Sequence, residues 1–189
     1  MKQIFLILVS STAFIAGSMI GSSQTQSLPI GGDFEQQQDW YPTILPETRQ
    51  YTAFDWDSHI FHSGSHSLSI AIALSHPANQ EIAYNWTRAV PGFQEGKSYE
   101  LSGWVRTEKV KGTAWIIVQC WNDARNEMLG FATTQRDYPV SGTSDWTKVR
   151  TAFTVPEGTA EVRIRAGIAV PENIGGKVWF DDIDIRESR

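Results

Sequence analysis

The sequence predicts a single all-β domain, an antiparallel β-sandwich, and three observations support this. From residue 65 onward, apolar and polar side chains alternate with a period of two, in short runs that turn residues separate. No long run carries a helical stripe of apolar side chains. The 189 residues leave room for one domain with a sizeable core after any targeting segment.

The first strands are expected at residues 65–74, 81–90 and 98–106, with a turn at Pro91-Gly92. The first of them places its large apolar side chains on one face, opposite small Ser and Ala side chains. In the third, Leu101 and Val105 face the expected core, while Trp104 and Arg106 share the opposite face. The segment before them, residues 36–62, lacks steady alternation and is expected to form long loops with a short strand at 51–54.

Further strands are expected at residues 113–122, 146–155 and 162–168. In the first of these, the core face carries Ile116, Val118 and Cys120, and the opposite face carries Trp115, Gln119 and Trp121. The last run has an apolar face with Arg163 and Arg165 pointing outward. Many short strands at this spacing are typical of a sandwich.

The closing run, residues 178–185, has a fault in its alternation. Val178 and Phe180 share one face, but Ile183 and Ile185 have the opposite parity. A β-bulge at Asp181-Asp182 would restore the pattern and turn a carboxylate inward. An inward carboxylate must be neutralised, hydrogen-bonded or bound to a cation, so it either accepts backbone N–H bonds at the bulge or binds a metal. Acidic residues in the opening segment, at 32–35, favour a hard cation between the first and last strands.

The first 23 residues are predicted to be a signal peptide, with Lys2 before an apolar stretch and small residues at 21–23. An uncleaved membrane anchor is the alternative, because the stretch is nearly long enough to span a bilayer. Residues 24–30 are expected to be a short linker, and residues 31–189 the sandwich. The mature chain is therefore expected to be exported, as a secreted or periplasmic protein with no membrane attachment.

Composition narrows the classes of partner. The formal net charge of −5 argues against nucleic acid and anionic membrane surfaces. The single cysteine, Cys120, cannot form an intramolecular disulfide, and its apolar neighbours indicate a buried thiol. Eight tryptophans are present, and their rings serve cores and sugar-binding surfaces alike.

Several short segments, in this order, resemble jelly-roll carbohydrate-binding modules of families four, nine and twenty-two, which are sandwiches of the galactose-binding-domain-like type. The resemblance spans roughly residues 31–187 and is carried by the segments 31–35, 63–68, 96–106, 145–146, 153–156 and 178–183, together with Trp40. It implies a jelly-roll fold. It also implies a structural calcium ion that ties the first strand to the last, with candidate ligands Asp33, Glu35, Ser65, His66 and Asp182.

The resemblance further implies non-catalytic binding of a polysaccharide or oligosaccharide by aromatic stacking. The candidate surface combines Trp104 and Arg106 on one strand with Trp115, Gln119 and Trp121 on the next, and Trp56 in a loop extends it. Trp121, at a strand end, is the best candidate for an exposed ring. A buried aromatic is the commoner fate of a strand tryptophan, so Trp104 and Trp115 have core packing as their alternative.

Two other classes of function stay open. One is an exported structural or adhesion module that binds protein or spaces a complex. The other is a small glycoside-active enzyme, which the run Asp182-Ile183-Asp184 suggests through alternate carboxylates on one strand face. That run ends near the end of the sequence, where no strands remain to build a cleft, so catalysis is not expected. A separate carbohydrate-active enzyme is a possible partner of the binding module.

Overall fold

The computed structural model describes residues 27–36 and 39–188. Almost all of its regular structure is β-strand, with one short 3-10 helix, η1 (Pro46–Tyr51). The strands are β1 (Tyr41–Thr43), β2 (Thr52–Asp57), β3 (Ser67–Ile72), β4 (Ile82–Ala89), β5 (Ser98–Trp121), β6 (Met128–Thr133), β7 (Val140–Thr154), β8 (Glu161–Val170) and β9 (Lys177–Glu187).

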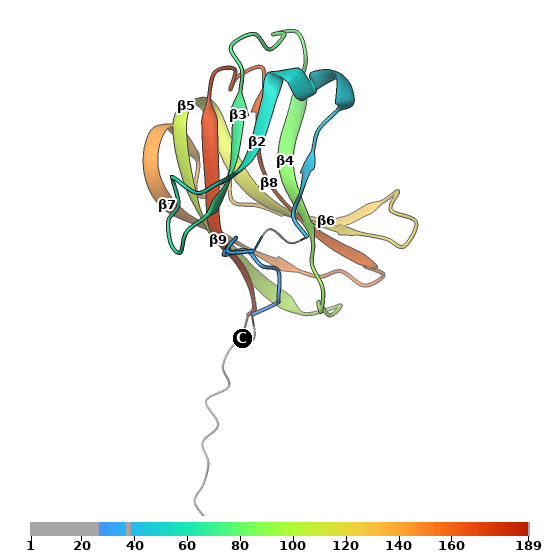
Figure 1. The fold of residues 1–189 in the computed structure, drawn as a ribbon. Coiled ribbons are helices and arrows are strands. Elements are labelled where there is room, and N and C mark those ends of the chain that lie inside the picture. The colour runs from blue at the N-terminus through green and yellow to red at the C-terminus, as the bar shows by residue number, and fades with distance from the viewer. Residues whose placement is uncertain (1–26, 37–38, 189) are drawn as a thin grey trace, which may run out of the picture.

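These strands form two antiparallel sheets that face each other (Figure 1). Sheet A has the order β7-β5-β9-β3-β2, and sheet B has the order β1-β4-β8-β5-β6. The long strand β5 belongs to both, because its first half pairs with β7 and β9 and its second half pairs with β8 and β6. The predicted antiparallel jelly-roll sandwich is confirmed.

The core fills the space between the sheets. Sheet A contributes Leu101 and Val105, sheet B contributes Ile116 and Val118, and all four are buried in one cluster. Gly103 allows the two halves of β5 to approach, since a Cβ on it would lie 2.6 Å from Cδ1 of Ile116. The alternation found in the sequence therefore separates core from surface correctly on both halves of β5.

Two short edge strands were not predicted. β6 has partly or fully exposed side chains along its whole length, so it lacks the alternation of a half-buried strand. β1 is three residues long and contains a proline, which is tolerated at a sheet edge. Both flank sheet B, and both carry side chains of the candidate site described below.

The predicted β-bulge in β9 is confirmed. Ser102 pairs with Asp184 and Trp104 pairs with Asp181, so β9 has an extra residue at this point. Asp182 absorbs the distortion with a φ of 46°. As a result the Asp181 side chain is fully buried, and Ile183 and Ile185 return to the core face.

The domain begins before residue 31. Ser27 forms a β-bridge with Arg186, and the N–H of Leu28 donates to the carbonyl of Ile185 at 2.8 Å. Leu28 and Ile30 are part of the core. The expected linker at 24–30 is thus corrected for its last four residues, which belong to the domain because the apolar side chains of Leu28 and Ile30 are buried in its core. The expected signal peptide, residues 1–23, lies outside the described residues. Within the described part of the chain, no helix is long and apolar enough to cross a membrane.

Candidate functional site

The predicted ligand-binding residues lie on two different faces of the molecule. Trp104 and Arg106 belong to the half of β5 in sheet A, and Trp115, Gln119 and Trp121 belong to the half in sheet B. The interpretation that these residues share one face on adjacent strands is therefore wrong, because the two runs are halves of one strand that passes from one sheet to the other.

The outer face of sheet A holds its aromatic rings in contact with other protein groups. The Trp104 ring stacks on the His62 ring with centroids 3.9 Å apart, and Trp146 meets the same imidazole edge-on at 5.8 Å. The Arg106 guanidinium lies 3.4 Å from the Asp145 carboxylate and covers the ring of Trp179. The stacking face of Trp104 toward His62 is thus already used.

Trp56 is also held by the protein. Its indole N–H donates to the carbonyl of Phe34 at 2.6 Å, and its ring stacks on His66 with centroids 3.7 Å apart. Its neighbours on β2 and β3 direct it toward the edge of the core, where it packs against buried side chains.

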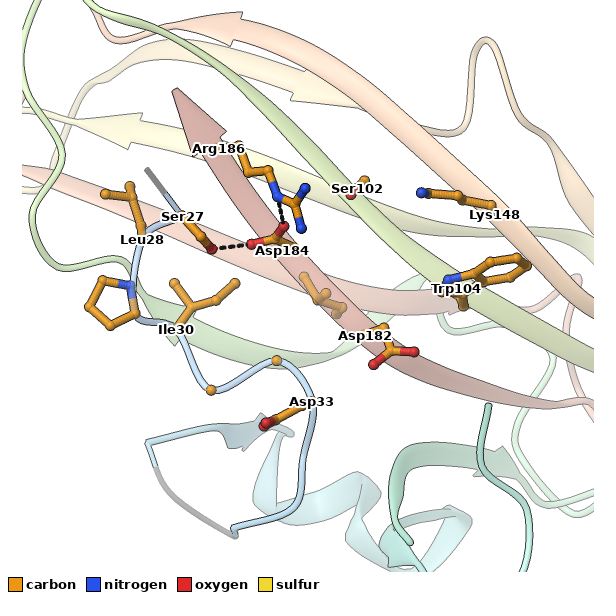
Figure 2. Close-up of a pocket in the computed structure, with 14 residues that line it drawn as sticks. Ser27, Leu28, Ile30, Asp33, Ser102, Trp104, Lys148, Asp182, Asp184 and Arg186 are labelled. Atoms are coloured by element: carbon orange, nitrogen blue, oxygen red, sulfur yellow. Dashed lines mark hydrogen bonds and ion pairs between the residues drawn. The ribbon is translucent and has the colours of Figure 1, made fainter. Parts of the chain in front are cut away.

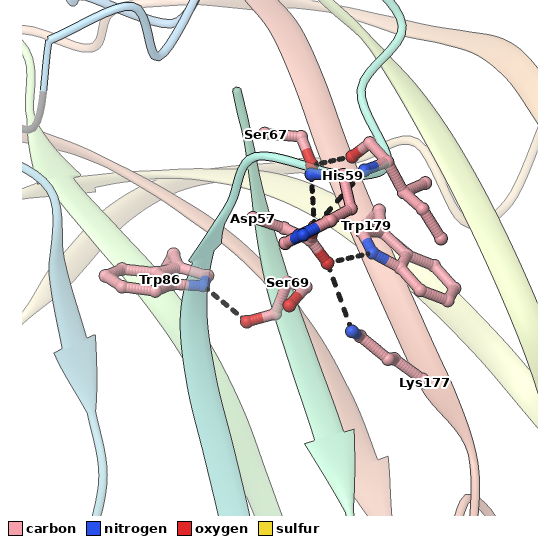
Figure 3. A network of polar contacts seen from close by, with 8 residues as sticks. Asp57, His59, Ser67, Ser69, Trp86, Lys177 and Trp179 are labelled. Atoms are coloured by element: carbon pink, nitrogen blue, oxygen red, sulfur yellow. Dashed lines mark hydrogen bonds and ion pairs between the residues drawn. The ribbon is translucent and has the colours of Figure 1, made fainter. Parts of the chain in front are cut away.

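A polar network anchors the loop after β2 (Figure 3). The Asp57 carboxylate accepts hydrogen bonds from the Trp179 indole at 2.9 Å and from Lys177 at 3.2 Å. It also accepts from the backbone N–H groups of His59 and Ile60. Burial alone would raise the pKa of Asp57, but these donors outweigh it and lower the pKa to about 2. The Asp57 carboxylate thus ties the loop after β2 to strand β9.

Backbone donors satisfy the carboxylate at the β-bulge. Asp181 accepts from the N–H groups of His62 at 2.7 Å, Ser63 at 3.2 Å and Asp182 at 2.7 Å. Burial nevertheless raises the pKa of Asp181 to about 6, against the lowering effect of these three donors. Of the two alternatives that the sequence left open for this carboxylate, hydrogen bonding to the backbone is the one observed.

The candidate calcium ligands are engaged in similar ways. Glu35 accepts from the hydroxyl and the N–H of Ser65 and from the N–H of His66, and the Ser65 donors lower its pKa. Asp182 bonds His62 Nδ1 at 2.7 Å and the Ser63 hydroxyl at 2.8 Å. Among the described residues no three His, Cys, Asp or Glu side chains form a group that fits a metal ion. Glu35 and Asp182 therefore each have donors from the protein, and the calcium ion stays a prediction from sequence.

A pocket of about 470 Å³ lies beside these groups, on the outer side of sheet A (Figure 2). Its walls are the N-terminal segment, which carries Asp33, and strands β9 and β5, which carry Asp184 and Trp104. Within it, Asp184 is bonded to the Ser27 hydroxyl and to Arg186. The pocket thus has both acidic and basic side chains in its walls, and one of its carboxylates, Asp184, already has two protein partners.

The side chains on the outer face of sheet B fall into four rows across the strands. Directly opposed residues on antiparallel strands point to the same side of a sheet, so the register defines each row. From β1, β4 or β8 toward β5 or β6, the rows are Thr43-Asn85-Gly167-Trp115, Tyr41-Thr87-Arg165-Ile117-Thr133, Ala89-Arg163-Gln119-Phe131 and Glu161-Trp121-Met128.

Trp115 forms the closed end of this face. It is only 9% exposed, and its indole N–H donates to Asn85 Oδ1 at 3.2 Å. Gly167 makes this contact possible, because a Cβ there would lie 2.2 Å from the Tyr84 carbonyl oxygen and 2.5 Å from Asn85 Oδ1. The alternative of packing, rather than ligand contact, therefore applies to Trp115.

Trp121 lies at the other end and is half-buried, not enclosed between the sheets. Its indole N–H donates to Gln119 Oε1 at 3.3 Å, and the Arg163 guanidinium lies 5.8 Å from its ring centre. Arg163 donates to Glu161 Oε1 at 2.6 Å, which fixes the guanidinium beside the indole. Gln119 and Arg163, the latter held by Glu161, thus hold the ring in one orientation.

Two exposed aromatic rings join Trp121 on this face. Tyr41 on β1 is 48% exposed, and Phe131 on β6 is 54% exposed. Tyr41 and Arg163 also line a pocket of about 410 Å³ with Arg125 and Glu161. The sequence analysis missed both rings because it missed both edge strands. The sequence signal available was an aromatic residue in each of two short segments that lack a period-two alternation.

Comparison with known proteins supports the fold. No protein-family model and no curated protein sequence matches this chain. Solved structures do match. The xylan-binding domain CBM22-1 of Paenibacillus barcinonensis Xyn10C is 15% identical with a TM-score of 0.57, covering 86% of this chain and 95% of that one. Carbohydrate-binding modules of families 16 and 61 share the fold.

Other matches have different descriptions. Tailspike protein 4 of bacteriophage CBA120, in its enzymatically active domain, is 14% identical with a TM-score of 0.56 over 83% of this chain. This chain covers only 20% of that protein. A Stig cyclase from Fischerella sp. TAU is 11% identical with a TM-score of 0.56, covering 87% of this chain and 98% of the cyclase. At these identities the chain has the fold of jelly-roll carbohydrate-binding modules, a fold that also carries other functions.

Proposed function

We propose that this protein is a non-catalytic module that binds a glycan chain on the outer face of sheet B. The observation that carries the proposal is the gathering of Trp121, Phe131 and Tyr41 with Gln119 and Arg163 on one open sheet face. The shared fold of the neighbouring modules, one of them described as xylan-binding, supports it.

The chemistry of the face suits a sugar chain. The apolar side of a pyranose ring packs on an aromatic ring, and its hydroxyl groups need hydrogen-bond partners at the edges. Trp121 offers an indole held in a fixed orientation, so little conformational entropy is lost when a ligand binds it. Gln119 and Arg163 supply an amide and a guanidinium beside the ring for hydroxyl groups.

The face does not suit glycoside hydrolysis. That reaction ordinarily needs two carboxyl groups placed across the scissile bond. The four rows contain a single carboxylate, Glu161, which is bonded to Arg163 and lies 2.7 Å from Arg125 Nε. We therefore assign binding rather than catalysis to this surface.

The proposal is tested by screening the purified domain on a glycan array, followed by titration calorimetry with the best ligands. Trp121→Ala removes the main ring and Phe131→Ala a second one. Trp104→Ala is the matched control, because it deletes the same side chain type from the outer face of sheet A. We expect the first two variants to weaken binding about tenfold, as anchor tryptophans do, with the control unchanged.

Absence of binding to every glycan, together with an intact fold, would contradict the proposal and favour an adhesion or spacer module. Equal losses in Trp121→Ala and Trp104→Ala would place the site elsewhere. We further propose export of the mature chain, which N-terminal sequencing of the protein from the culture medium or periplasm would test. A chain that still begins at Met1 would contradict cleavage.

A further inference from the structure

Arg165 lies at the centre of the outer face of sheet B. Its strand, β8, is the middle strand of that sheet, with β4 on one side and β5 on the other. In its row the neighbours are Thr87 and Ile117, and Tyr41 stands at the sheet edge. A cation is therefore placed in the middle of the surface that we propose for glycan binding.

This guanidinium has no anionic partner in the described part of the chain. Its Nε atom is buried and has no hydrogen-bond partner there, and none of the ion pairs found among those residues includes Arg165. Burial, and next the positive charge of Arg163, lower the pKa of Arg165. Burying part of a cation without a partner costs stability, so the fold gains nothing from this charge.

The carboxylate on the same face of β8, Glu161, does not neutralise the charge of Arg165. Glu161 lies two rows away on the same strand, where Arg163 donates to its Oε1 at 2.6 Å. Arg125 Nε lies 2.7 Å from its Oε2, as an ion pair outside hydrogen-bond geometry. Two arginines, Arg163 and Arg125, thus share this one carboxylate and none is left for Arg165, although the chain as a whole carries a net charge of −5.

We propose that Arg165 is a specificity residue that binds the carboxylate of an acidic sugar, a uronic acid, within the glycan chain. This inference rests on the proposed function and adds the chemical class of the ligand. A guanidinium matches a carboxylate by two parallel N–H···O bonds, which are strongest where water is partly excluded. A neutral sugar leaves the buried charge unmatched and so loses this contribution.

The spacing along β8 and β5 also sets a minimum size for the ligand. The rows of Arg165 and Trp121 are separated by four residues along the strands, which at about 3.4 Å per residue is roughly 14 Å. A single sugar is too short to contact both groups. An oligosaccharide with a uronate at one position and a stacked ring at another contacts both.

The test uses short oligosaccharides of galacturonate, glucuronate, mannuronate and guluronate, each paired with its methyl ester, which has the same backbone without the charge. Binding is measured by titration calorimetry with the wild-type domain, Arg165→Gln and Arg165→Lys. Arg186→Gln is the matched control, because it removes one positive charge from the outer face of sheet A. Melting temperatures are measured for every variant.

We expect at least one uronate to bind about tenfold more tightly than its ester, and Arg165→Gln to abolish this preference while the affinity for the ester stays the same. Arg165→Lys should retain only part of the preference for the uronate, because an ammonium group cannot form the two parallel N–H···O bonds of a guanidinium. Arg165→Gln should melt no lower than the wild type, since it removes an uncompensated charge.

Equal affinity for every acid and its ester would overturn the inference, as would a preference that survives in Arg165→Gln. Tighter binding of a sulfated glucan than of all four uronates would overturn it as well. In each of these cases binding of neutral glycans that depends on Trp121 would leave the proposed function standing. The proposed function fails separately, if neither neutral nor acidic glycans bind.

Discussion

The buried carboxylate of Asp181 should make the stability of this domain fall as the pH rises from about 4 to about 6. Burial raises the pKa of this group from 3.8 to about 6, so the folded state holds a proton that the unfolded state has already lost. The unfolding free energy therefore decreases across this window and is level above it. At about 1.36 kcal/mol per pKa unit, the decrease attributable to Asp181 is roughly 3 kcal/mol.

The perturbation that isolates this effect is Asp181→Asn. The amide does not titrate, but it retains one oxygen that can accept from the N–H groups of His62 and Ser63. The variant loses stability at every pH, because the third donor, the N–H of Asp182, is left without an acceptor. The informative quantity is the difference between wild type and variant as a function of pH.

Urea unfolding followed by tryptophan fluorescence at about pH 4, 5, 6 and 7 gives that difference. We expect the wild type to lose up to roughly 3 kcal/mol relative to Asp181→Asn between the first and the last of these values. A difference that stays constant, or that favours the wild type at higher pH, would show that the backbone donors outweigh burial and refute the reasoning.

Three further predictions concern other parts of the fold. Asp57→Ala leaves the Trp179 indole and the His59 and Ile60 N–H groups without their acceptor, so we expect a loss on the order of 3 kcal/mol in urea unfolding; a loss below about 1 kcal/mol would contradict the network. Because the pKa of Asp57 is lowered to about 2, its contribution is complete above about pH 4 and disappears as the pH falls through about 2. Gly167→Ala places a methyl group against the Tyr84 carbonyl oxygen, so we expect the free energy of unfolding to fall by about 1–3 kcal/mol and the fluorescence of Trp115 to change. Gly142→Ala is the control, because a Cβ there meets open space and adds only the smaller strain of a positive φ. The calcium ion predicted from sequence would stabilise the folded state by binding to it, so we expect a chelator to lower the melting temperature and added calcium to restore it; a melting temperature that neither treatment changes would contradict the ion.

The fold class and the bulge could be predicted from the sequence because both determine which side chains alternate between the core and the surface. Val178 and Phe180 on one side of the break, with Ile183 and Ile185 on the other, required an extra residue in β9, and the structure has it at Asp182. What satisfies Asp181 was beyond the sequence, because its donors come from a loop more than a hundred residues earlier in the chain. Hydrogen bonds of this kind depend on tertiary contacts.

The candidate site was predicted in part. Parity placed Trp121, Gln119 and Arg163 away from the core, as the structure shows. Parity did not reveal that β5 changes sheets. The core positions shift from odd at Leu101 and Val105 to even at Ile116 and Val118, but the sequence between them was taken as a break between two strands. The edge strands that bring Tyr41 and Phe131 were missed because exposed strands have no apolar face to alternate.

The location of the bound glycan is the most direct test of the central claim. A titration of the isotope-labelled domain with its best oligosaccharide, followed through the indole N–H signals of the tryptophans, reports on both outer faces in one experiment. We predict that the Trp121 signal shifts most, because its indole N–H lies on the outer face of sheet B beside Gln119. We predict unchanged signals for Trp104 and Trp179 on sheet A. Shifts confined to Trp104, Trp146 or Trp179, with Trp121 unmoved, would contradict the account.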